Sequence, residues 1–174
     1  ELIKSAKGRC FVLFTSYRMM HLVAEGLTTQ MDYPVYMQGQ MSKRIILEKF
    51  TRHGNAVLLG TASFWEGVDV RGSTLSCVII DKLPFSAPDD PLLQAKMQDC
   101  QMQGKDPFAH LQLPQAVIAL KQGVGRLIRD NKDKGVLVIC DNRLVTRQYG
   151  QVFLKSLPPM RRTRSLEDAN TFLK

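Results

Sequence analysis

The stretch "RCFVLFTSYRMMHLVAEGLTTQ", residues 9–30, decides the fold class of this chain. Its first part, residues 9–16, is a largely apolar run of strand length, which is typical of a strand buried on both faces of a sheet. In its second part, residues 17–30, apolar residues recur at the spacing of an amphipathic helix. A buried strand followed at once by a helix predicts a strand–helix unit of the kind that builds parallel sheets.

The same alternation continues along the rest of the chain. Four further runs of strand length predict strands within "PVYMQG" (34–39), "NAVLLGTASF" (55–64), "TLSCVIIDKLPF" (74–85) and "GVLVICD" (135–141). Helical spacing predicts helices at 42–54 with Ser42 as the N-cap, near 89–103, around 114–130 and over 146–157, with loop in the remainder of 87–114. We therefore predict an α/β fold with a mostly parallel sheet flanked by helices on both faces.

The composition is that of one globular domain and narrows the classes of partner. The chain has 174 residues, 44% of them hydrophobic, and a formal net charge of +8. A basic balance of this size is compatible with nucleic acid, another polyanion or an acidic protein. No apolar run approaches the roughly 20 residues of a membrane-spanning helix, so we expect no membrane association. Because the chain begins without methionine, we expect it to be part of a longer protein.

The cysteines and histidines predict no metal site. No pair of cysteines has CxxC spacing, and the three histidines are scattered singly. Isolated cysteines in apolar runs are typical of buried, reduced thiols in a cytoplasmic protein. Three of the four cysteines lie in such runs, namely Cys10, Cys77 and Cys140, and the fourth is Cys100.

The segment "KQGVGRLIRD", residues 121–130, combines a predicted helix with glycines and arginines. On a helical wheel its apolar side is formed by Val117, Leu120, Val124, Leu127 and Ile128, and nearly the opposite side by Gln122, Gly125, Arg126 and Arg129. One interpretation is a solvated basic face near a helix C-terminus. The other is a phosphate site, because Gly123 and Gly125 each cost about 1 kcal/mol in a helix and suggest close approach of a ligand or another backbone.

The loop "TASFWEGVDVRG", residues 61–72, is a second candidate site. It follows a strand whose carboxyl end we expect at residues 59–60, and open α/β sheets bind ligands at that edge. Glu66 and Asp69 flank Gly67, which indicates either ordinary turn chemistry or a ligand contact. Trp65 is either a partly buried anchor or a platform for stacking a base.

Five blocks together resemble one enzyme family. "QGVGRLIR" resembles motif VI of superfamily 2 helicases, Gln-x-x-Gly-Arg-x-x-Arg, and "SFWEGVDVRG" resembles motif V of their XPD/DinG branch. "VLFTSY" is similar to the motif IV region of that branch, and "DKLPFSAPDDP" and "CDNRLVTRQYGQVFLKSLP" are similar to its flanking signatures. The resemblance covers residues 8–158, and the order of the blocks makes it specific.

The resemblance implies a RecA-like second motor domain, with ATP and Mg²⁺ in the cleft between it and a first motor domain of the same chain. It implies catalytic roles for three residues, with Arg126 and Arg129 as arginine fingers and Gln122 bonded to nucleotide or water. The residues implied at the nucleotide cleft are Glu66, Gly67, Asp69, Gly123 and Gly125. The residues implied along single-stranded DNA are Thr15, Ser16, Tyr17 and Trp65.

The 174 residues lack motifs that ATP hydrolysis requires, and this determines the activity that we expect. They contain no GxxxxGK[ST] loop and no DEAH-type run, and the resemblance places four iron–sulfur cysteines in the first half of the family's chain. We therefore expect this domain to be inactive alone and the full enzyme to move 5′→3′ on single-stranded DNA in repair or replication. The alternative is a non-enzymatic module that binds protein or nucleic acid on a degenerate motor fold. The outward row of Gln122, Arg126 and Arg129 argues against degeneracy.

The last residues form a predicted basic tail, 160–174, after a motor domain at 1–159. Pro158 and Pro159 end the preceding helix, and Ser165 with Asp168 predicts the start of a short one. Its apolar face docks either on this domain or on another protein, for which the resemblance to bacterial members implies the chi subunit of the DNA polymerase III clamp loader. The residues of that candidate surface are Leu166, Ala169, Phe172 and Leu173, with Arg161, Arg162 and Arg164 at its rim.

Overall fold

A five-stranded parallel sheet is the centre of the described part of the chain. The computed structural model describes residues 1–61, 64, 70, 74–125 and 134–174. The strands lie in the order β2-β3-β1-β4-β5, and every neighbouring pair is parallel. They are β1 (Cys10–Phe14), β2 (Val35–Met37), β3 (Val57–Thr61), β4 (Cys77–Ile80) and β5 (Val136–Ile139). The predicted α/β class and mostly parallel sheet are confirmed.

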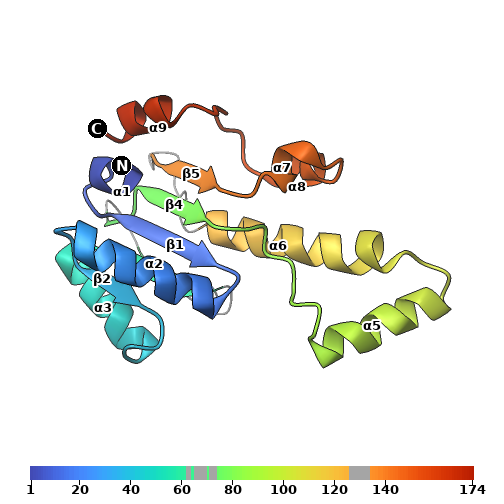
Figure 1. Ribbon diagram of the computed structural model, residues 1–174. Coiled ribbons are helices and arrows are strands. Elements are labelled where there is room, and N and C mark those ends of the chain that lie inside the picture. Colours follow the sequence, from blue (N-terminus) through green and yellow to red (C-terminus); the bar gives the residue numbers. More distant parts are fainter. Residues whose placement is uncertain (62–63, 65–69, 71–73, 126–133) are drawn as a thin grey trace.

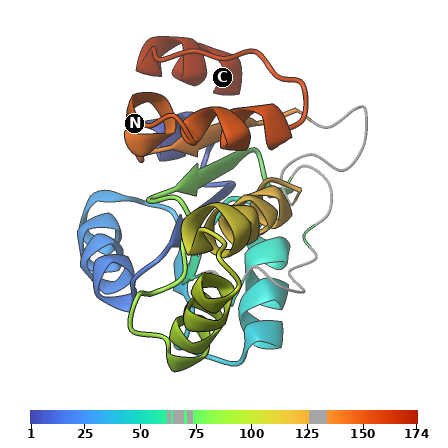
Figure 2. The same ribbon diagram turned by 90° about the vertical axis from the view of Figure 1, so that its right-hand side faces the viewer.

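Helices cover both faces of this sheet, as predicted. Figure 2 shows α2 and α3 on opposite sides of it. One face carries α1 (Leu2–Ser5), α2 (Tyr17–Gln30) and α9 (Leu166–Leu173), and the other carries α3 (Lys43–His53), α6 (Leu113–Val124) and α8 (Gly150–Ser156). The remaining described helices are α5 (Pro91–Met102), the π-helix η2 (Phe108–Gln112) and α7 (Arg143–Thr146).

The burial of the central strands explains why their sequence is so apolar. Every residue of β1 and of β3 is buried. In β1, Phe11 and Leu13 point toward α3, α6 and α8, whereas Val12 and Phe14 pack with α2 on the other face. A strand covered on both faces has no polar side, and a continuous apolar run is the result.

Two predicted details of the secondary structure are wrong. The predicted loop after 103 contains η2, which leads directly into α6. The helix predicted over 146–157 begins only at Gly150, as α8, and a separate short helix, α7, precedes it and ends at Thr146, because Arg147 is extended. Gly150 allows α8 to follow so closely, since a Cβ at Gly150 would collide with the carbonyl oxygen of Leu144.

The capping rules are obeyed at the start of α5 but only in part at the start of α3. Asp90 accepts the backbone N–H groups of Leu92 and Leu93 at 2.8 and 3.2 Å, and Pro91 begins α5. Ser42 occupies the N-cap position of α3 as predicted, but its side chain accepts no capping bond within the described residues.

The C-terminal helix begins where its capping residue predicts. The Oγ atom of Ser165 accepts the backbone N–H of Asp168 at 3.1 Å. The carboxylate of Asp168 accepts the Thr163 hydroxyl at 2.7 Å, and that hydroxyl accepts the Ser165 N–H at 3.0 Å. The reciprocal half of a capping box is therefore made through Thr163.

In the structure α9 docks on its own domain, beside α1 and near the N-terminus (Figure 1). Ser5 donates a hydrogen bond of 2.9 Å to Asn170, and Leu173 is buried with Ile3. The predicted single apolar face divides, because Leu166 and Phe172 remain 50% and 58% exposed. Leu166 lies about 10 Å along the helix from Leu173, and Phe172 lies about 100° around it.

The cysteines only partly follow their prediction. All four are free; Cys10 and Cys77 are buried, but Cys140 is exposed. Cys140 directly follows β5, an edge strand whose residues are only half-buried, so its prediction as a buried thiol is wrong. No helix among the described residues has the length and apolar character needed to cross a membrane.

Candidate functional site

The motif IV residues lie at the carboxyl edge of the sheet. Phe14 at the end of β1 pairs with Thr61 at the end of β3, so Thr15, Ser16 and Tyr17 begin beside the end of β3. All three are exposed, and Tyr17 exposes 53% of its surface. The structure therefore brings the predicted DNA contacts next to the start of the predicted motif V loop.

The same edge also carries the N-terminus of α2. The Oγ atom of Ser16 accepts the backbone N–H of Met19 at 3.4 Å, and α2 runs for 14 residues from Tyr17. A helix N-terminus favours anions because its first N–H groups and its dipole are directed outward. Exposed hydroxyls at this place can donate hydrogen bonds to phosphate oxygens.

Gln38 joins these elements, and the sequence analysis missed it. Its Oε1 atom accepts the backbone N–H and the hydroxyl of Thr61 at 2.8 and 2.9 Å. Its Nε2 atom donates to the Tyr17 hydroxyl at 2.8 Å. The available signal was the position of Gln38 near the carboxyl end of the strand predicted within 34–39, since the carboxyl ends of parallel strands share one edge.

Most predicted motif V residues, namely Trp65, Glu66, Gly67 and Asp69, lie outside the described residues. Phe64 and Val70 are described, and both are buried in the core with 4% and 3% exposure. Phe64 packs so closely over the end of β3 that a Cβ at Gly60 would lie 2.9 Å from its ring. Gly60 is thus required for close packing of Phe64.

The described part of motif VI has the predicted two-sided character. Leu120 and Val124 are buried, whereas Gln122 and Gly125 are exposed. Gly123 is buried on the core side and so does not share the exposed side of Gln122 and Gly125. Arg126 and Arg129 lie outside the described residues.

The exposed side of α6 fits a site that is completed by another domain. The nearest atoms to a Cβ at Gly125 would be the carbonyl oxygens of Lys121 and Gln122, at 3.3 and 3.7 Å. These atoms belong to the preceding turn of the same segment, so no other described residue covers the side of Gly125. An exposed amide beside an uncovered glycine is compatible with a nucleotide phosphate approaching this surface. No group of three or more His, Cys, Asp or Glu within the described residues could hold a metal ion.

A partly buried ion pair joins the two flanking signatures, "DKLPF" and "CDNRL". The Asp141 carboxylate accepts the Leu83 N–H at 2.9 Å and the Nε and Nη2 atoms of Arg143 at 3.0 and 2.6 Å. Burial raises the pKa of Asp141, but the hydrogen bonds from Arg143 and Leu83 outweigh it, so its pKa lies below the ordinary value. The carboxylate therefore stays charged and joins the chain after β4 to the chain after β5.

Aromatic rings extend this connection to the helix that carries motif VI. The guanidinium of Arg143 lies 5.4 Å from the centre of the Phe85 ring. Phe85 stacks on Phe108 of η2 at 5.8 Å and meets Tyr149 edge-on at 5.8 Å. Because η2 leads directly into α6, this cluster sets the start of α6.

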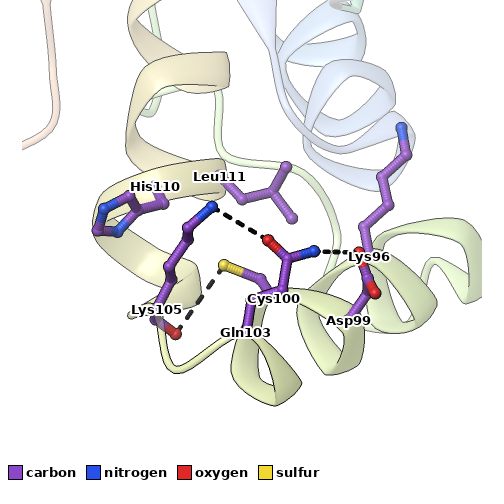
Figure 3. Close-up of a pocket in the computed structure, with 7 residues that line it drawn as sticks. All are labelled: Lys96, Asp99, Cys100, Gln103, Lys105, His110 and Leu111. Atoms are coloured by element: carbon purple, nitrogen blue, oxygen red, sulfur yellow. Dashed lines mark hydrogen bonds between the residues drawn. The ribbon is translucent and has the colours of Figure 1, made fainter.

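A hollow of about 310 Å³ lies between α5 and η2 and contains none of the predicted site residues. Figure 3 shows Lys105 donating to Gln103 and Gln103 donating to Asp99, at 3.0 and 2.9 Å. Its polar groups thus bond largely to one another. The lining residues are Lys96, Asp99, Cys100, Gln103, Lys105, His110 and Leu111.

Comparisons with known proteins identify the family. Residues 1–160 match the helicase C-terminal domain family. The chain is 61% identical over 172 residues to ATP-dependent DNA helicase YoaA of Escherichia coli, covering 99% of this chain and 27% of that protein. It is 39% identical to ATP-dependent helicase DinG of Mycobacterium tuberculosis, covering 100% of this chain and 26% of that protein. The chain thus spans about a quarter of the length of these relatives.

Solved structures agree on the fold. A structure titled XPD helicase superposes with a TM-score of 0.66 at 24% identity, over 89% of this chain and 29% of that one. Domain 2 of the DEAD-box helicase Mss116p superposes with a TM-score of 0.52 at 11% identity, over 98% of this chain and 59% of that one. These identities support a RecA-like fold and nothing finer. The chain belongs to the family of helicase C-terminal domains, in the XPD/DinG branch of superfamily 2.

Proposed function

We propose that this chain is the second motor domain of an ATP-dependent DNA helicase that moves 5′→3′ on single-stranded DNA during repair or replication. The observation that carries the proposal is the two-sided α6, which anchors Leu120 and Val124 in the core and leaves Gln122 and Gly125 exposed. Relatives named as ATP-dependent helicases support the same reading. The domain would supply one side of a nucleotide cleft.

This side of the nucleotide cleft would act by stabilising negative charge on the phosphates. Arg126 and Arg129 would donate hydrogen bonds to phosphoryl oxygens as negative charge develops on them, and Gln122 would orient the nucleotide or the attacking water. The exposed Gly125 would leave room for the facing domain. Hydrolysis of ATP, with Mg²⁺ held by the first motor domain, supplies the free energy for movement.

Coupling to DNA would run through the carboxyl edge of the sheet. Thr15, Ser16 and Tyr17 would contact backbone phosphates, and Trp65 would stack on a base. Residues of the motif V loop would link this track to the nucleotide; they are Glu66, Gly67 and Asp69. The exposed hydroxyls beside the N-terminus of α2 support this path.

The remainder of the protein would supply what these residues do not contain. We propose that the first motor domain carries the phosphate loop, the magnesium carboxylates and an iron–sulfur cluster, and that the whole protein is cytoplasmic. The isolated 174-residue chain should then show no ATPase activity. DNA-stimulated turnover by this chain, surviving removal of contaminating ATPases, would contradict the proposal.

The tail is proposed to bind the chi subunit of the DNA polymerase III clamp loader. In the structure Leu173 and the hydrogen bond between Ser5 and Asn170 hold α9 on its own domain, and Ala169 is half-buried. Leu166 and Phe172 are therefore the exposed apolar groups that a partner could contact. Arg164 is exposed, Arg161 lies 3.7 Å from Asp168, and Arg162 donates to the Leu154 carbonyl at 2.9 Å. These arginines would meet acidic residues at the rim of the interface.

Unwinding by the full-length protein tests the proposed activity and its direction. Duplexes with a single-stranded 5′ tail or 3′ tail are compared, with ATP or without it. We expect DNA-stimulated ATP hydrolysis and unwinding of the 5′-tailed duplex only. Unwinding only from a 3′ tail would overturn the direction, and absence of DNA-stimulated hydrolysis would overturn the motor assignment.

A further inference from the structure

Gln38 is held on both sides at the carboxyl edge of the sheet. Its backbone N–H donates to the Leu59 carbonyl at 2.9 Å, which fixes the residue beside β3. Its side-chain oxygen accepts two hydrogen bonds from Thr61, and its side-chain nitrogen donates one to Tyr17. One side chain therefore ties the ends of β2 and β3 to the first residue of α2.

The chemistry of these bonds fixes which way the amide faces. The backbone N–H of Thr61 can only donate, so the atom of Gln38 that faces it at 2.8 Å has to be the oxygen. The NH₂ group is then left to face the Tyr17 hydroxyl. A phenol that accepts a hydrogen bond keeps its own proton for another acceptor.

We propose that Gln38 is a positioning residue of the DNA track, which orients the Tyr17 hydroxyl to donate its proton to a phosphate oxygen of single-stranded DNA. The inference rests on the proposed function, since it assumes that DNA passes Tyr17. Gln38 itself need not touch the DNA. Because Thr61 is the last residue of β3, the orientation of this hydroxyl follows the position of that strand end.

The direction of the hydrogen bond gives a specific test. Gln38→Glu keeps an acceptor for Thr61 but places a carboxylate oxygen against Tyr17, so the tyrosine hydroxyl donates inward and is lost to phosphate. Tyr17→Phe removes the same donor while keeping the ring. The matched control is Gln40→Glu, because the exposed Gln40 side chain accepts the backbone N–H of Met37 at 3.0 Å, its one side-chain bond among the described residues, and glutamate can do the same. Like Gln38→Glu, this control variant adds one negative charge, two residues further along the chain.

The experiment measures binding of a fluorescent oligothymidylate to full-length protein at fixed salt. Tyr17→Phe and Gln38→Glu should each weaken binding by about tenfold, and the double variant should be no weaker than either alone. Gln40→Glu should stay within about twofold. ATP hydrolysis without DNA should be unchanged in the control Gln40→Glu, whereas in Gln38→Glu the DNA concentration giving half-maximal stimulation of hydrolysis should rise.

Several outcomes would overturn the inference. Single effects that multiply in the double variant would show that Gln38 acts independently of the hydroxyl. Equal effects of Gln38→Glu and Gln40→Glu would show that the added negative charge alone weakens binding. Normal binding by Tyr17→Phe would show that the Tyr17 hydroxyl does not contribute to DNA binding, and this result overturns the inference even if the Gln38 variant fails to fold. These results leave the proposed motor function standing, whereas a wild-type protein that does not bind the oligonucleotide would overturn both.

Discussion

Replacing Asp141 with alanine should lower the free energy of unfolding of this domain by about 2–4 kcal/mol. The Asp141 side chain is 5% exposed, and its carboxylate accepts hydrogen bonds from Leu83 and Arg143. Removing it leaves the Leu83 N–H without a partner in the core, which costs about 1–3 kcal/mol. The lost ion pair adds about 1 kcal/mol rather than the full value of a buried pair, because the Arg143 side chain is 38% exposed and can turn to water.

Asp141→Asn separates these two contributions. Its amide oxygen can still accept the Leu83 N–H, so the loss should be about half as large, roughly 1–2 kcal/mol. The free energies of unfolding are compared on this chain by urea unfolding followed by circular dichroism. In thermal unfolding, the midpoint of the alanine variant should lie about 5–15 °C below that of the wild type. Equal stability of the alanine variant and the wild type would refute the reasoning, since it would mean that the Asp141 hydrogen bonds contribute nothing.

The pH dependence provides a second check on the same residue. The pKa of Asp141 is lower in the folded protein than in the unfolded chain, so its stabilising contribution is complete above the unfolded pKa and is lost as the pH falls through the folded pKa. The difference between wild type and Asp141→Asn should be constant between about pH 5 and 8 and shrink below about pH 4. A difference that persists undiminished at lower pH would contradict this explanation.

Two further predictions concern the tail and the motif V loop. Deleting residues 160–174 should lower the melting temperature because it removes the buried Leu173, whereas Leu166→Ser with Phe172→Ser should leave it unchanged and abolish chi binding, measured by calorimetry. Chi binding that survives the double substitution would contradict the proposed surface. Trp65→Ala in the full-length protein should weaken single-stranded DNA binding by about 1–3 kcal/mol at matched salt, and unchanged affinity would mark Trp65 as a structural anchor.

Sequence patterns over a few residues predicted the helices and strands whose formation depends on neighbouring residues. The apolar run before Ser16 predicted β1, because a strand covered on both faces must be apolar throughout. The start of α9 was predicted from Ser165, since capping involves residues only a few positions apart. The alternation of strands and helices along the chain was enough to predict the parallel sheet.

Long-range contacts account for what the sequence analysis missed or got wrong. The bond between Gln38 and Thr61 spans 23 positions, and no local pattern marks such a pair. The exposure of Cys140 follows from the place of β5 at the edge of the sheet, which depends on strand order. The division of α9 into a docked and an exposed side depends on where α1 lies.

The central claim is that this domain contributes arginine fingers to a shared nucleotide site. It is tested most directly by the ATPase turnover of the full-length protein carrying Arg126→Ala or Arg129→Ala. The matched control is Lys121→Ala, which removes an exposed positive charge from the last turn of α6. Each arginine variant should fold normally and lose on the order of 10³-fold in turnover, while the Lys121 variant stays close to the wild type. Normal turnover in the arginine variants, or an equal loss in the Lys121 variant, would contradict the claim.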